Sequence, residues 1–243
     1  YAKSKKTAII ESDGKYVDYI SLNKKINELA KSLNSETICL ICSGVNIESL
    51  SIYLACLRKK CIPLLLDVNT KIENIKNIIK NFSPQYFYYK TEKNIKSQVY
   101  SLNYFEENTA GLQDFYLYHK KTQPILNGNI YLLLSTSGST GSSKFAKISK
   151  NNIFSNTREI VRYLNIDKND STLTNLPMNY SYGLSIVNSH FNAGASIILS
   201  NKSIIDRQTI SLVKKNKITN FNGVPSTYEM IFRFNLQNIY LKN

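Results

Sequence analysis

Short apolar runs, each followed by an amphipathic helical pattern, restrict the fold that the first half of this chain can adopt. The runs span residues 37–42, 61–66 and 85–89, and apolar side chains occupy both alternating sets of positions in each. A strand of this kind must be covered on both faces, which is typical of parallel strands in α/β proteins. Three consecutive strand–helix alternations therefore predict an α/β fold with mostly parallel β-sheets flanked by helices.

Capping residues mark the expected helix starts. Strands are predicted at 7–11 and 16–19, after which Ser21 is expected to cap the first helix, and Asp206 is expected to cap a helix near the end of the chain. Both residue types accept a hydrogen bond from a backbone N–H in the first helical turn.

The second half repeats the alternation. Residues 90–129 are expected to connect the halves and to hold one strand, at 98–102. A length of 243 residues allows one large domain or two small ones, and we expect two lobes, 1–129 and 130–243. The later strands are predicted at 144–148, 171–175, 195–199 and 218–222.

The charge pattern bears on possible partners. The chain has 31 Lys and Arg against 17 Asp and Glu, a formal charge of +14. The lysines are scattered, whereas a nucleic-acid footprint is concentrated on one face or element, so no nucleic-acid partner is expected. A positive field would instead attract an anionic substrate. No stretch is long and apolar enough to predict a membrane span.

Four cysteines superficially resemble a zinc-binding set: Cys39, Cys42, Cys56 and Cys61. Cys39 and Cys42 lie three residues apart in a predicted strand, so their side chains should point to opposite faces. We therefore predict buried, reduced thiols and no metal site, which favours a cytoplasmic protein.

The most informative stretch is Ser-Thr-Ser-Gly-Ser-Thr-Gly-Ser-Ser-Lys at 135–144, which directly follows the apolar run 130–134. Glycines let a backbone approach phosphate oxygens, and hydroxyl and amide groups donate hydrogen bonds to them. Lys144 adds a positive charge. The stretch therefore predicts an anion-binding loop at the end of a buried strand, and the alternative is a polar turn between strands.

Two common phosphate motifs do not fit this loop. A Walker loop has four residues between its glycines and Lys directly after the second, whereas Gly138 and Gly141 enclose two residues and Lys144 comes three residues later. A dinucleotide fingerprint would need Gly-x-Gly, which is missing.

The order of residues 135–144 instead resembles the phosphate-binding signature of the AMP-forming acyl-activating enzymes: acyl-CoA synthetases, peptide-synthetase adenylation domains and luciferases. The family's usual form is Thr-Ser-Gly-Ser/Thr-Thr-Gly-x-Pro-Lys-Gly. The chain keeps the first six positions and the lysine, but has Ser143 for the proline and Phe145 for the last glycine.

Three further segments resemble the family in the expected order. They are 57–67, which contains Pro63-Leu64, then 177–184, and finally 223–226. The second is similar to a substrate-pocket motif, Pro-x-x-His-x-x-Gly-Leu, with Tyr180 in place of histidine.

The resemblance implies a ligase that activates a carboxylic acid with ATP and Mg²⁺ as an acyl-adenylate. Transfer to a thiol, of coenzyme A or an acyl-carrier protein, would follow. It implies that the ATP phosphates contact Thr136, Ser137, Gly138, Ser139, Thr140, Gly141 and Lys144. It implies an acyl-substrate pocket formed by Tyr180, Tyr182, Gly183, Gly223, Val224, Pro225 and Ser226.

In the family, adenine, ribose and magnesium contacts and a catalytic lysine follow at positions beyond 243. The chain is therefore expected to be the N-terminal part of the large AMP-binding domain, without a catalytic residue of its own and not competent alone. The alternative is a degenerate or truncated nucleotide-binding module without catalysis, to which the departures at Ser143 and Phe145 point.

Overall fold

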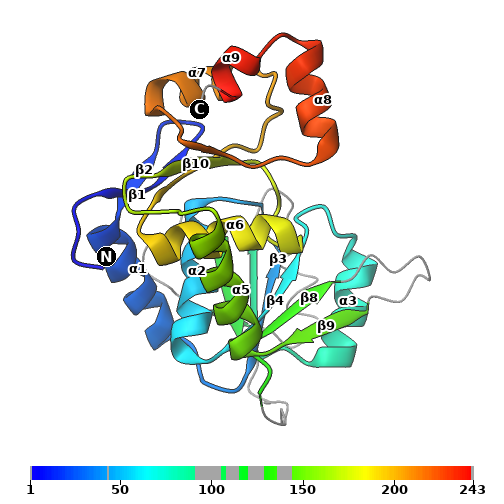
Figure 1. The fold of residues 1–243 in the computed structure, drawn as a ribbon. Helices are drawn as coiled ribbons and strands as arrows, with labels where there is room; N and C mark the ends of the chain where they lie inside the picture. Colours follow the sequence, from blue (N-terminus) through cyan, green and yellow to red (C-terminus); the bar gives the residue numbers. More distant parts are fainter. Residues whose placement is uncertain are drawn as a thin grey trace. The chain divides into compact units, whose positions relative to one another are not determined.

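The fold was analysed in a computed structural model that describes residues 2–42, 44–90, 105–107, 115–119, 129–135 and 144–241 (Figure 1). The chain divides into two compact units. The first comprises Tyr1–Leu22, Val45–Ile47 and Phe154–Asn243, and the second comprises Asn23–Gly44 and Glu48–Ile153. The division into lobes 1–129 and 130–243, made from the sequence, stays a prediction.

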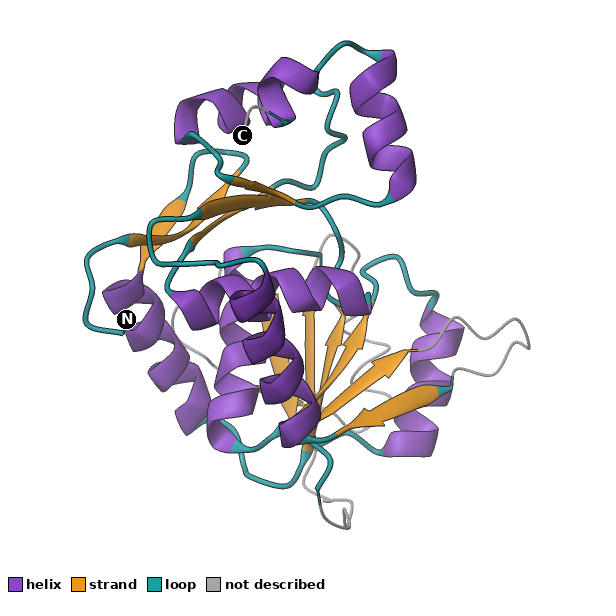
Figure 2. Cartoon of the chain, viewed as in Figure 1, coloured by secondary structure: helices purple, strands orange, loops and turns teal. Residues whose placement is uncertain are grey.

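The second unit is built on a seven-stranded sheet in the order β6-β7-β5-β3-β4-β8-β9. Strands are drawn in orange in Figure 2. The four neighbouring strands β5, β3, β4 and β8 are parallel, whereas β7, β6 and β9 are antiparallel to their neighbours. The strands are β3 (Ile38–Cys42), β4 (Ile62–Leu66), β5 (Tyr86–Lys90), β6 (Phe105–Glu107), β7 (Phe115–His119), β8 (Leu132–Ser135) and β9 (Phe145–Ile148). The parallel centre confirms the predicted fold class.

Helices α2 (Ile47–Lys59) and α3 (Ile72–Phe82) connect the central strands. Ile75, Ile78 and Ile79 of α3 are buried, and their i, i+3, i+4 spacing places them on one face of the helix. They pack in a core with residues of all four parallel strands, including Leu40 and Leu64. The apolar stripe of α3 therefore covers one face of this sheet.

The four cysteines are free and buried, as predicted. Burial raises the pKa of the Cys39 thiol, which interacts with the thiol of Cys56. Cys42 Sγ donates to the Asp67 carbonyl at 3.1 Å, and burial raises its pKa to about 12. The raised pKa values keep the thiols of Cys39 and Cys42 protonated at neutral pH, and all four cysteines serve as small core residues.

The first unit is built on a five-stranded sheet in the order β12-β10-β11-β1-β2. All neighbours are parallel except β1 and β2, which form an antiparallel hairpin. The N-terminal strand therefore pairs with a strand almost 190 residues later, Ile9 opposite Ile197. The strands are β1 (Thr7–Glu11), β2 (Tyr16–Asp18), β10 (Ser171–Thr174), β11 (Ser196–Leu199) and β12 (Asn220–Phe221).

Helices lie on both faces of this sheet (Figure 1). Helix α6 (Ser181–Ala193) contacts β10 and β11 on one face. On the other face, α7 (Arg207–Asn216), α8 (Pro225–Arg233) and α9 (Gln237–Tyr240) share a buried core with the sheet.

The N-terminal segment holds the carboxyl end of α6. Tyr19 Oη donates to the Ala195 carbonyl at 2.7 Å, and its ring meets that of Phe191 edge-on, with centroids 6.4 Å apart. Lys6 Nζ donates to the Gly194 carbonyl at 3.0 Å, where a cation suits the negative end of the helix dipole.

Of the two helix caps predicted from the sequence, Ser21 is wrong and Asp206 is confirmed. Helix α1 (Tyr19–Lys31) contains Ser21, so the predicted Ser21 cap is wrong. Asp18 takes this role, because its Oδ1 accepts from the Ser21 N–H at 2.7 Å. Asp206 caps α7 as predicted and accepts from the Gln208 N–H at 2.8 Å.

The connection between the halves contains two strands that the sequence did not predict, β6 and β7. The predicted strand at 98–102 lies outside the described residues. Among the helices that the structure describes, none combines the length and apolarity needed to cross a bilayer.

Buried His190 in α6 gives the first unit a pH-dependent stability. Its Nδ1 lies 2.8 Å from the Ile186 carbonyl oxygen, and Nε2 is buried with no hydrogen-bond partner among the described residues. Desolvation lowers the pKa of His190 below its ordinary value of 6.5, although Ile186 and Asp170 partly offset the effect. The folded state therefore binds fewer protons than the unfolded state below pH 6.5.

We expect the free energy of unfolding to fall as pH drops below 6.5 toward the folded-state pKa, by at most about 1.4 kcal/mol per pH unit for one proton. His190→Leu should flatten this dependence in urea unfolding curves measured between pH 5 and 7 (about the range of histidine titration). His119→Leu, at the other histidine, is the control. If the free energy of unfolding of His190→Leu still falls with pH as steeply as in the unmodified protein, His190 is not the group responsible.

Candidate functional site

The loop motif at 135–144 joins two antiparallel strands, β8 and β9. Ser135, the last residue of β8, is paired with Phe145, the first of β9, so the pairing holds the two ends of the motif together. On its other side β8 is parallel to β4, with Leu133 opposite Leu64. The motif thus leaves the carboxyl end of a buried parallel strand, where α/β proteins commonly bind ligands.

Lys144 is the one predicted phosphate-binding residue that the structure describes. It is exposed and directly precedes β9, at the base of the loop. A cation at this place fits the phosphate group that the motif implies. The other predicted phosphate residues lie outside the described part of the chain: Thr136, Ser137, Gly138, Ser139, Thr140 and Gly141.

Phe145, where the family has glycine, has a packing role. Its ring meets Phe82 of α3 edge-on, with centroids 5.0 Å apart, and it borders the core of the second unit. This departure from the family pattern therefore adds a contact between β9 and α3.

The segment 177–184 forms the start of α6. Tyr180 is the N-cap residue, with extended backbone and 47% of its surface exposed. Gly183 packs against the preceding turn so closely that a Cβ there would lie 2.5 Å from the Pro177 carbonyl oxygen and 2.9 Å from that of Leu176. Glycine at 183 therefore allows α6 to begin this close to its own connecting segment.

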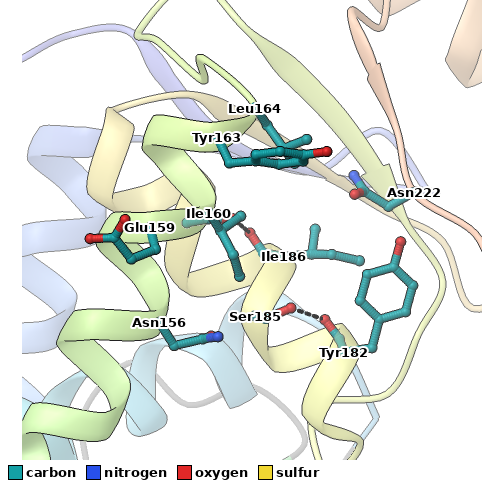
Figure 3. A pocket seen from close by; sticks show the side chains of 10 residues that line it. Asn156, Glu159, Ile160, Tyr163, Leu164, Tyr182, Ser185, Ile186 and Asn222 are labelled. Atoms are coloured by element: carbon teal, nitrogen blue, oxygen red, sulfur yellow. Dashed lines mark hydrogen bonds between the residues drawn. The ribbon is translucent and has the colours of Figure 1, made fainter.

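An open cavity of about 590 Å³ lies between α6 and α5 (Lys150–Tyr163) in the first unit (Figure 3). Its size is that of a small-molecule site. The cavity is lined by Asn156, Glu159, Ile160, Tyr163, Leu164, Tyr182, Ser185, Ile186, Ser189 and Asn222.

Most lining residues were not predicted from the sequence, although their spacing carries a signal. Asn156, Ile160 and Tyr163 follow an i, i+4, i+7 pattern on α5, so they share one face of that helix. On α6, Tyr182 and Ser185 are three residues apart, so they share one face of that helix, and both side chains line the cavity. The pattern predicts a shared face, but only the tertiary structure brings the two faces together.

Tyr182 connects the cavity with the segment 223–226. Burial raises the pKa of the Tyr182 phenol, Tyr228 raises it further, and a hydrogen bond from the Gly223 backbone partly offsets both. Tyr182 therefore lies beside Gly223, and Asn222, the neighbour of Gly223, lines the cavity. The phenol stays protonated at neutral pH and can act as a hydrogen-bond donor.

The remaining predicted acyl-pocket residues lie at the start of α8. Val224 is the N-cap residue, Pro225 is the first helical residue, and Pro225 and Ser226 are exposed. None of these three, nor Tyr180, Gly183 or Gly223, lines the cavity. Their role in binding an acid stays a prediction.

The described residues offer no ready metal site. Within the described ranges, no group of three or more His, Cys, Asp and Glu side chains could hold a metal ion.

Two α/β units with mainly parallel central strands make a fold that solved structures of other proteins share. The sequence profile described as AMP-binding enzyme matches residues 1–242, and the chain belongs to that family.

Solved structures of the same fold cover nearly the whole chain. Apo MatB from Rhodopseudomonas palustris matches 94% of it at 21% identity, with a TM-score of 0.77. O-succinylbenzoate coenzyme A synthetase (MenE) from Bacillus subtilis, in complex with AMP, matches 94% at 16% identity and a TM-score of 0.75. The chain spans 48% of the MatB structure and 61% of the MenE structure. No curated protein matches the chain.

Proposed function

We propose that the protein to which this chain belongs activates a carboxylic acid with ATP, forming an acyl-adenylate and pyrophosphate. The observation that carries the proposal is the loop motif of an AMP-binding enzyme at the carboxyl end of β8, with Lys144 at its base. Neighbouring folds support the use of nucleotide, since MatB was crystallised with ATP and MenE with ATP and magnesium ion.

In this proposal the chain binds and polarises the phosphates. ATP supplies the phosphoryl centre that the carboxylate attacks and the pyrophosphate that leaves. Lys144 would stabilise the charge that builds on the departing phosphates, and Thr136 to Gly141 would donate hydroxyl and amide hydrogen bonds to them. Mg²⁺ would be held mainly through the nucleotide.

The acid would bind in the cavity between α5 and α6, with Tyr182 on its wall. The activated acyl group would pass to a thiol, of coenzyme A or of a carrier protein. We further propose a cytoplasmic location, because the four buried thiols are free, which suits a reducing compartment.

Acid-dependent ATP–pyrophosphate exchange tests this function in the protein. Incorporation of labelled pyrophosphate into ATP should rise with a suitable acid and vanish without it. Calorimetry measures ATP binding separately and so distinguishes a ligase from a nucleotide-binding module without catalysis. If ATP binds but a broad panel of carboxylic acids gives no exchange, the protein is a nucleotide-binding module and not a ligase.

A further inference from the structure

The wall of the cavity between α5 and α6 is mainly apolar and aromatic. Ile160, Leu164 and Ile186 supply aliphatic surface, and Tyr163 and Tyr182 supply rings. A wall of this kind suits a flat or aliphatic ligand body, because burying apolar surface is favourable and aromatic rings pack against one another.

The serine hydroxyls on α6 already use their hydrogens within the helix. Ser185 Oγ donates to the Tyr182 carbonyl at 2.8 Å, and Ser189 Oγ donates to the Ile186 carbonyl at 3.1 Å. A hydroxyl has one hydrogen, so toward a ligand these oxygens can only accept.

The amide of Asn222 is oriented by a similar bond. Its Nδ2 donates to Thr172 Oγ1 at 2.8 Å, which leaves Oδ1 as an acceptor. The phenol groups of Tyr163 and Tyr182 both extend toward Asn222 (Figure 3). One end of the cavity therefore gathers uncharged polar groups around an amide oxygen.

Positive charge is missing from this wall. Among the described residues that line the cavity, none is Lys or Arg, and Glu159 carries the only charge. The Glu159 carboxylate lies 3.4 Å from the Arg158 guanidinium and 3.9 Å from that of Arg162, all three being exposed. A second ligand carboxylate on this wall would find no cationic side chain there. Its donors would be the phenol groups of Tyr163 and Tyr182, and neutral donors compensate a negative charge less well than a cation does.

We propose that the cavity receives a monocarboxylic acid with an aromatic or otherwise apolar body and a hydrogen-bond donor, such as a phenolic hydroxyl or an amino group. Ser185 Oγ and Asn222 Oδ1 accept from that donor. A second carboxylate at the same place is rejected. This inference rests on the proposed function, since it assigns the cavity to the acid.

Two rigid acids of the same shape test this assignment. In 4-hydroxybenzoate a donor stands opposite the reacting carboxylate, and in terephthalate a second carboxylate stands there. Calorimetric titration of the protein should give about 10-fold tighter binding of 4-hydroxybenzoate, since a polar or charged group without a matching partner weakens binding by about 5- to 150-fold.

A charge introduced at Ser185 should reverse the preference. Ser185→Lys places an ammonium group on the cavity wall, and terephthalate should then bind more tightly than 4-hydroxybenzoate. The matched control is Ser155→Lys, an exposed position on α5 that does not line the cavity, which should keep the original order.

The outcomes separate this inference from the proposed function. Equal binding of the two acids, tighter terephthalate binding, or no binding of 4-hydroxybenzoate would overturn the inference. Exchange of pyrophosphate that both acids support equally would overturn it too, yet keep the ligase function. Selective binding of 4-hydroxybenzoate without exchange by any acid would keep the ligand class of the cavity and refute the ligase.

Discussion

Lys144→Ala is expected to lower the rate of acid-dependent ATP–pyrophosphate exchange about 100-fold, the usual effect of losing one group that stabilises a charged transition state. Lys144 is exposed at the base of the 135–144 loop, directly before β9, so its replacement removes charge without opening a cavity in the core. The loss should therefore appear in kcat, while the thermal unfolding temperature stays nearly unchanged.

Lys147→Ala is the matched control. Lys147 is another exposed lysine, on β9 itself, and it lies outside the loop motif. Its replacement tests whether exchange depends on the position of the charge or only on the net charge of the protein. Equal losses in both variants, or unchanged exchange in Lys144→Ala, would refute the assignment of Lys144 to the phosphates. Lys144→Arg should recover part of the rate, because it keeps the charge but changes its geometry.

The fold class could be predicted because it depends on local patterns. The strands β3 and β4 are wholly apolar on both faces, β5 is aromatic up to its last residue, Lys90, and the α3 stripe repeats at helical spacing. Such patterns require only neighbouring residues. The hairpin around the loop motif was partly predictable for the same reason, since an apolar strand precedes it and an alternating strand follows.

The parts that could not be predicted depend on long-range contacts. Nothing near Ile9 in the sequence indicates that β1 pairs with β11, almost 190 residues later. The cavity likewise forms only where α5 and α6 meet. Two of its lining residues, Asn156 and Ser185, lie outside every motif found in the sequence. Ser21 was mistaken for a cap because an aspartate three residues earlier competes for the same role, and the structure favours Asp18.

Gly183→Ala is expected to destabilise the protein by about 2 kcal/mol, within the usual range for overpacking a tight contact. Two effects of opposite sign compete at this position. Alanine favours a helix over glycine by about 1 kcal/mol. A Cβ at 183, however, would lie 2.5 Å from the Pro177 carbonyl oxygen, and backbone atoms cannot rotate away as a flexible side chain can. We expect the steric effect to exceed the helix propensity.

Thermal unfolding followed by circular dichroism measures the result, and a net loss of about 2 kcal/mol corresponds to about 4–8 °C in a protein of this size. Gly223→Ala is the comparison, because a Cβ there would lie 3.0 Å from Cβ and Cγ2 of Thr227 and 3.3 Å from the Phe221 ring, a milder overlap than the one at Gly183, so its loss should be smaller. Gly183→Val should cost more than Gly183→Ala, since it adds bulk at the same contact. A higher unfolding temperature in Gly183→Ala would mean that helix propensity prevails and that the start of α6 can move away from Pro177. In that case this contact would not fix the position of Tyr182, one residue earlier in α6.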